Sequence, residues 1–223
     1  MNGSRKLITL TVVVALAGGL ALMFGSSLRA TLVGLFGPPE VELAESFADA
    51  DGALVFDHAV FDELLREHVD PGGFVDYPGL AERSAELDTY IGTLATAPFE
   101  EMGRDERLAL LINAYNAFTL RLILDHYPTE SIRDIPGARR WEAVRWDLAG
   151  ETYSLDQIEH ELVRPNFREP RIHFTLVCAA VGCPPLRAEA FTGERLEEQL
   201  EEQTRQAHLS DRWLRYRSGS GEI

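Results

Sequence analysis

The side chains best suited to chemistry gather in one stretch, RIHFTLVCAAVGCPPLR. It contains His173 and the two cysteines of the chain, Cys178 and Cys183. A cysteine thiolate becomes a nucleophile when an imidazole within hydrogen-bond reach takes its proton and a third group orients that imidazole. Two cysteines five residues apart can instead close a small disulfide loop, which persists in an oxidising compartment. We rank the disulfide first and the nucleophile close behind it.

The same residues are less suited to binding a metal or to redox catalysis. A metal site would need His160 or His173 to join both thiols, and C-x4-C lies at the wide end of zinc-ligand spacing. The sequence has no second cysteine pair to complete four ligands. The spacing also differs from the C-x-x-C of thioredoxin-type redox sites. We therefore expect neither a metal nor a cofactor.

Two further polar pairs could support an active site. Asn113 and Asn116 are three residues apart, so they lie on one face of a helix that is otherwise apolar. A buried amide without a partner costs about 1–3 kcal/mol, so we expect both amides to brace a neighbouring loop rather than to act on a substrate. Glu159 and His160 follow a helix start at Ser154. His160 could be a base, although a lone helical histidine is more often a structural hydrogen-bonding group.

Helical periodicity dominates the segments that must position these groups. Apolar residues at helical spacing predict helices over 60–69, 80–94, 106–126, 155–163 and 196–208, with an extended piece over 74–77. Alternation predicts a hairpin over 145–155, a buried strand over 171–178 and a last strand over 213–217. In an ideal strand, His173 and Cys178 would face opposite sides. The order of elements predicts an α+β single domain, helix-rich with a small late sheet.

The N-terminal segment predicts the compartment. Leu7 to Gly25 is a run of 19 uncharged residues preceded by Arg5 and Lys6. A helix of about 20 apolar residues spans a bilayer, and positive flanks stay in the cytoplasm. We expect a cytoplasmic stub at 1–6, a transmembrane anchor at 7–25, a linker at 26–54 and a domain at 55–223. This places a single-pass protein in a bacterial inner membrane with its domain in the periplasm. Secretion after signal-peptide cleavage is the alternative.

The net charge of the chain limits the classes of partner that it can bind. The chain has a formal charge of -15, and residues 1–36 hold three basic residues and no acid. The rest therefore carries 18 basic against 36 acidic residues. Such a body repels phosphate backbones, so nucleic-acid binding is disfavoured. The membrane, through the N-terminal helix, is the one partner that the sequence predicts, and the substrate or partner protein stays open.

Four motifs follow one another along the chain: FDELLREHVDPGGFVDYPGL, LLINAYNAFTLRLILDHYP with SIRDI, YSLDQIEHELVRP, and EPRIHFTLVCAAVGCPPLRAEAF. Together, over roughly Val55 to Arg217, they resemble the "domain of unknown function 547" family. The resemblance implies a bacterial envelope or secreted protein with one α/β-type domain and no assigned activity. The family signature falls on Asn113, Tyr115, Asn116, Glu159, His160, Arg164, His173, Cys178, Cys183 and Pro184.

Two differences within the family affect these expectations. The resemblance implies that plant relatives lack the second thiol, which weakens both an essential disulfide and an essential Cys183 and shifts weight towards Cys178 with His160 or His173. Members also continue past a final glycine hairpin, so we expect the domain to be truncated at its C-terminal end.

Two functions of different classes follow. The first is a cysteine-dependent hydrolase or transferase, by analogy with papain or transglutaminase folds. Its candidate residues are Cys178, His173, His160, Glu159, Asn113 and Asn116. The second is a non-catalytic envelope interaction module in which Cys178 and Cys183 form a structural disulfide.

Overall fold

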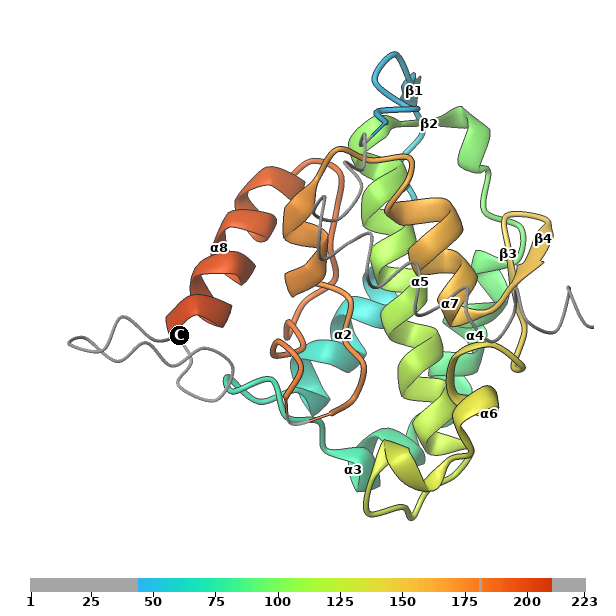
Figure 1. Ribbon diagram of the computed structural model, residues 1–223, viewed down its shortest axis with the longest axis vertical. Coiled ribbons are helices and arrows are strands. Elements are labelled where there is room, and N and C mark those ends of the chain that lie inside the picture. The colour runs from blue at the N-terminus through green and yellow to red at the C-terminus, as the bar shows by residue number, and fades with distance from the viewer. Residues whose placement is uncertain (1–43, 181, 210–223) are drawn as a thin grey trace, which may run out of the picture. The chain divides into compact units, whose positions relative to one another are not determined.

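A long central helix organises the fold (Figure 1). The computed structural model describes residues 44–180 and 182–209. Within them, α5 spans Arg104–Leu124 and is buried on nearly all sides, which confirms the helix predicted over 106–126. It is the one helix in the described ranges that is long and apolar enough to cross a membrane. Most of it is covered by other parts of the domain, so it is a core helix.

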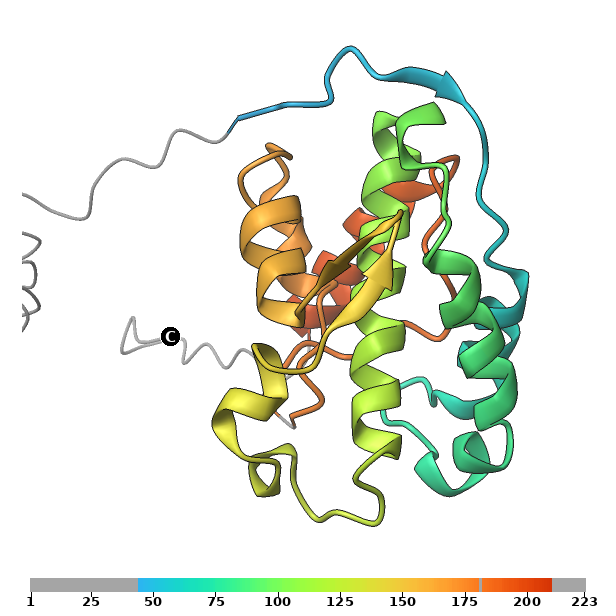
Figure 2. The same ribbon diagram turned by 90° about the vertical axis from the view of Figure 1, so that its right-hand side faces the viewer.

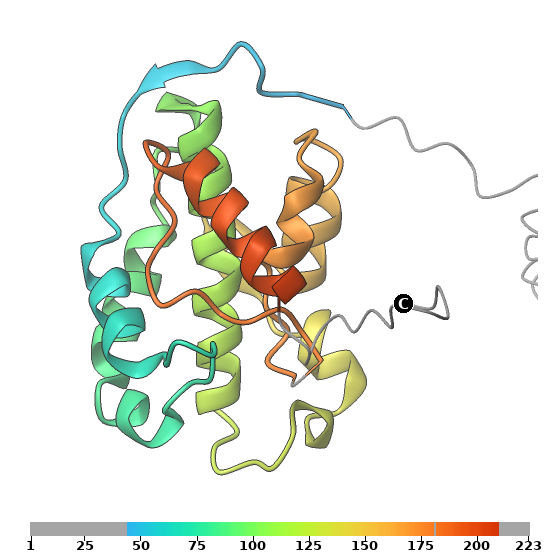
Figure 3. The same cartoon turned by 90° about the vertical axis from the view of Figure 1, so that its left-hand side faces the viewer.

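Three helices cover one side of α5, as Figures 2 and 3 both show. They are α2 (Ala59–His68), α3 (Tyr77–Glu82) and α4 (Ser84–Leu94). The rings of Phe61 and Tyr90 stack at 4.8 Å between centroids and join α2 to α4. The single helix predicted over 80–94 is replaced in the structure by two helices, α3 and α4. The chain enters α3 already at Tyr77, because Asp76 caps the helix by accepting a hydrogen bond from the Gly79 amide at 3.2 Å.

Two small antiparallel sheets complete an α+β domain rich in helix. β1 (Asp51–Ala53) pairs with β2 (Met102–Gly103), and β3 (Trp146–Leu148) pairs with β4 (Glu151–Tyr153). The second pair is the predicted hairpin. Ala149 and Gly150 both have positive φ, 51° and 85°, as a two-residue turn of the I′ type requires. The tip is fixed to the end of α4 by the Ala149 amide, which donates to the Leu94 carbonyl at 2.9 Å.

The remaining helical segments are short, except for the last. They are η1 (Phe99–Glu101), η2 (Ile132–Asp134), α6 (Gly137–Trp141), α7 (Leu155–Gln157), η3 (Ile158–Val163) and α8 (Leu196–Leu209). α7 and η3 form the helix predicted over 155–163, but η3 is a π-helix. α8 confirms the predicted helix over 196–208 and lies across α5 in Figure 3. The predicted transmembrane helix at 7–25 and the predicted strand at 213–217 lie outside the described residues.

The buried strand predicted over 171–178 is wrong. Residues Pro170–Phe174 form a 3₁₀ helix, η4, and the chain then runs irregularly. Glu169 caps this helix by accepting from the Arg171 amide at 3.0 Å. Further along the chain, the Thr175 carbonyl and the Val177 amide are hydrogen-bonded to the side chain of Asn116 on α5. The segment therefore satisfies its hydrogen bonds without a neighbouring strand, which an apolar sequence pattern alone does not reveal.

A cluster of arginines around one carboxylate ties the loop after the cysteines to α2 and α8. Glu189 accepts from Arg187 Nε at 2.8 Å, from Arg66 at 3.0 Å and from Arg195 at 3.1 Å. Burial alone would raise the pKa of Glu189. Hydrogen bonds from Arg187, Gln199 and Arg195 outweigh it and lower that pKa to about 2. The carboxylate is thus charged at neutral pH and holds the loop between the two helices.

Candidate functional site

Both asparagines of α5 brace loop backbone, as their burial predicts. Asn113 donates to the Phe191 carbonyl at 2.7 Å and accepts from the Phe191 amide at 2.9 Å. Asn116 donates to the Thr175 carbonyl at 2.9 Å and accepts from the Val177 amide at 3.0 Å. These amides position two loops that are far away in sequence.

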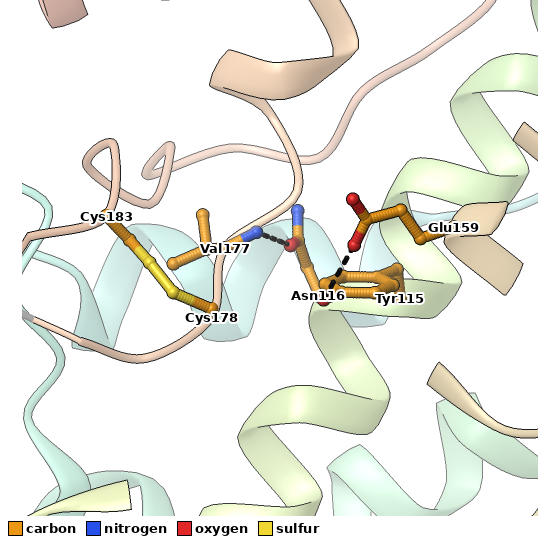
Figure 4. The surroundings of a disulfide bond; sticks show 6 residues. All are labelled: Tyr115, Asn116, Glu159, Val177, Cys178 and Cys183. Atoms are coloured by element: carbon orange, nitrogen blue, oxygen red, sulfur yellow. Dashed lines mark hydrogen bonds between the residues drawn. A yellow bond between two sulfur atoms is a disulfide. The ribbon is translucent and has the colours of Figure 1, made fainter. Parts of the chain in front are cut away.

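The two cysteines form a disulfide. Cys178 and Cys183 are bonded, with their Cα atoms 6.1 Å apart, and the described chain holds no free cysteine. Figure 4 shows the bond beside Val177, whose amide is held by Asn116. Inside the loop, Ala179 has φ of 52°, in the left-handed region that costs a non-glycine residue about 1–2 kcal/mol. Closing the loop holds the chain in this conformation.

Glu159 lies at the centre of a separate polar cluster at the start of the π-helix. Arg164 approaches one of its oxygens at 2.7 Å, and the Tyr115 hydroxyl donates to the other at 3.5 Å (Figure 4). Burial, and then the nearby Glu159 carboxylate, raise the pKa of Tyr115 well above its ordinary value. Tyr115 is therefore a neutral hydrogen-bond donor rather than a base.

The two candidate histidines lie next to this cluster at the surface. Arg164 contacts His173 Nδ1 at 3.4 Å, and Asp156 lies 3.6 Å from His160 Nε2. Burial, and then the positive charge of Arg164, lower the pKa of His173, so its imidazole is neutral at pH 7. The cluster brings together Glu159, His160 and His173 as a polar surface.

The structure does not join this cluster to the sulfurs. Within residues 44–180 and 182–209, His173 contacts Arg164, His160 contacts Asp156, and Cys178 is bonded to Cys183. In these ranges no hydrogen bond links an imidazole to a sulfur, and no group of three His, Cys, Asp or Glu side chains could hold a metal ion. The candidate bases, His160 and His173, therefore lie apart from the sulfurs, and no contact joins them among the described residues.

An apolar pocket adjoins the disulfide loop. Its volume is about 110 Å³. Three segments line it: residues 73–77, one face of α5, and the chain on both sides of the disulfide. The last two contribute Asn116, Thr119, Leu120, Val177, Ala179, Ala180, Pro184 and Leu186. Phe74, which also lines the pocket, is 52% exposed.

Three polar residues line this pocket: Tyr77, Asn116 and Thr119. Asn116 makes the backbone hydrogen bonds described above, and the Thr119 hydroxyl donates to the Tyr115 carbonyl at 2.9 Å. Burial raises the pKa of Tyr77 to about 12, so its hydroxyl stays protonated. The sequence did not indicate this pocket, because it forms only where three distant segments meet.

Comparison with known proteins places part of the chain in a family. Residues 99–206 match a family model described as "Protein of unknown function, DUF547". The matched range contains both asparagines, the polar cluster and the disulfide, but not residues 73–77 of the pocket. No curated protein and no solved structure matches the chain.

Proposed function

We propose that this chain, whose residues 99–206 belong to the DUF547 family, is a non-catalytic binding module with its site in the apolar pocket beside the Cys178–Cys183 loop. The observation that carries the proposal is the pocket itself. Ligand sites are concave and mostly apolar, with a few polar groups that fix orientation. This pocket has that composition, and its loop wall is held by a disulfide and by Asn116.

The size of the pocket limits what it can hold. An engineered cavity of about 150 Å³ in another protein accommodates benzene. A pocket of about 110 Å³ that is open at one side suits a similar group. The ligand is therefore an apolar side chain of a partner polypeptide, or a small molecule that carries such a group.

The expected location of the module is outside the cytoplasm, behind the predicted anchor at 7–25. A disulfide persists in oxidising compartments and is rare in the cytoplasm, which supports this location. The acidic body keeps the domain soluble and away from nucleic acid.

A cysteine-dependent hydrolase or transferase is the alternative. It requires Cys178 as a free thiolate within reach of His160 or His173. The disulfide and the contacts of the two imidazoles weigh against it. The two functions need opposite states of the sulfurs, so the thiol content of the native protein distinguishes them.

Nuclear magnetic resonance with toluene as a probe tests the binding site. We expect intermolecular nuclear Overhauser effects from the toluene ring to the methyl groups of Val177, Ala180 and Leu186, which line the pocket. Val60 and Leu209 serve as the control, because both are exposed apolar side chains outside the pocket lining. Contacts to these two residues alone, or no contacts at all, would contradict the proposal.

A further inference from the structure

We infer that the Tyr77 hydroxyl makes the pocket select apolar ligands that also carry a neutral hydrogen-bond acceptor. This inference rests on the proposed binding function of the pocket. It adds a chemical class of ligand and a residue that determines specificity.

The pocket lining includes three polar residues, Tyr77, Asn116 and Thr119. Asn116 accepts from the Val177 amide and donates to the Thr175 carbonyl, and the Thr119 hydroxyl donates to the Tyr115 carbonyl. Among the described residues, the Tyr77 hydroxyl makes no hydrogen bond. Its one specific contact is through the ring, which stacks on Tyr127 at 6.3 Å between centroids. Of the three polar lining side chains, Tyr77 is therefore the one that makes no hydrogen bond among the described residues.

The surroundings decide what this donor would bind. Tyr77 is half-buried beside apolar lining residues, and a ligand acceptor that leaves water for an apolar pocket needs a donor in exchange. At neutral pH the phenol is protonated, since its pKa is about 12. Among the described residues, the lining contains no basic side chain to balance an anion. A ketone, ester or amide carbonyl next to an apolar group fits these conditions, and a carboxylate does not.

A purely structural role for Tyr77 is the competing explanation. Tyr77 lines the pocket, and its ring stacks on Tyr127 in a contact that does not involve the hydroxyl. Tyr77→Phe keeps the ring and removes the donor, so it separates the two roles. Tyr127→Phe is a matched control, because it removes a hydroxyl from the stacking partner, which does not line the pocket.

The experiment compares acetophenone with isopropylbenzene, which have the same number of heavy atoms and differ in the carbonyl oxygen. Affinities come from chemical-shift titrations of the full chain. A net hydrogen bond contributes about 0.5–1.5 kcal/mol. We therefore expect Tyr77→Phe to weaken acetophenone binding by about 2- to 12-fold and to leave isopropylbenzene unchanged. Tyr127→Phe should change neither affinity.

Each other outcome has a distinct meaning. If both ligands bind the native protein and Tyr77→Phe changes them equally, the selectivity inference is overturned while the pocket remains a binding site. If neither ligand shifts the resonances of the pocket residues in the native protein, both the binding function and the inference are overturned.

Discussion

At the scale of single residues, the two asparagines show that a polar group in an apolar helix can be assigned from sequence. The cost of an unpaired buried amide predicts that each must have a backbone partner, and each has two. The partners could not be predicted, because they lie more than fifty residues away along the chain. Tyr77 could not be assigned either, since an uncommitted hydroxyl is recognised only when its neighbours are known.

The two asparagines should differ in their effect on ligand binding. Asn113→Ala and Asn116→Ala each leave a buried amide and a carbonyl without a partner, so each should destabilise the fold by about 2–4 kcal/mol in urea unfolding. Only Asn116 holds Val177, which lines the pocket. Toluene affinity should therefore fall in Asn116→Ala and stay unchanged in Asn113→Ala. Equal losses of affinity in the two variants would show that Asn116 has no special role at the pocket.

At the scale of elements, periodicity predicts helices well and irregular segments poorly. α2, α5 and α8 were predictable because long amphipathic or apolar stretches admit few other structures. The segment from Arg171 to Cys178 has the composition of a strand, but Glu169 and Asn116 supply side-chain hydrogen bonds that a strand would take from a neighbour. Its true structure depends on tertiary partners, which composition does not contain.

The disulfide-closed loop gives the element-scale prediction. If Cys178 and Cys183 are bonded in the cell, iodoacetamide added to acid-trapped cells should label neither cysteine until a reductant is present. The same result supports an oxidising compartment and removes the nucleophile that a hydrolase needs. Labelling of Cys178 without reductant would favour the hydrolase, and Cys178→Ser controls for labelling at the other cysteine.

At the scale of the whole molecule, the fold class follows from the sequence and the site does not. A buried central helix with surrounding amphipathic helices and small sheets is the predicted α+β domain. The pocket arises where residues 73–77, α5 and the disulfide loop meet. Only tertiary packing brings these three segments together, so no single motif indicates the site. The candidate residues gathered around Glu159 are close in space, whereas the sulfurs close the loop whose residues Ala179 and Ala180 line the pocket.

The most direct test of the binding site is to obstruct it without disturbing the core. Ala180 lines the pocket and is exposed, so Ala180→Trp places a large side chain at its mouth. Ala85 in α4 is equally an exposed alanine but lies outside the lining, so Ala85→Trp is the matched control. The measurement is the toluene affinity of both variants beside the native protein. The account predicts a loss of at least about tenfold, or about 1.4 kcal/mol, for Ala180→Trp and no change for Ala85→Trp. Equal affinities in the two variants would contradict it.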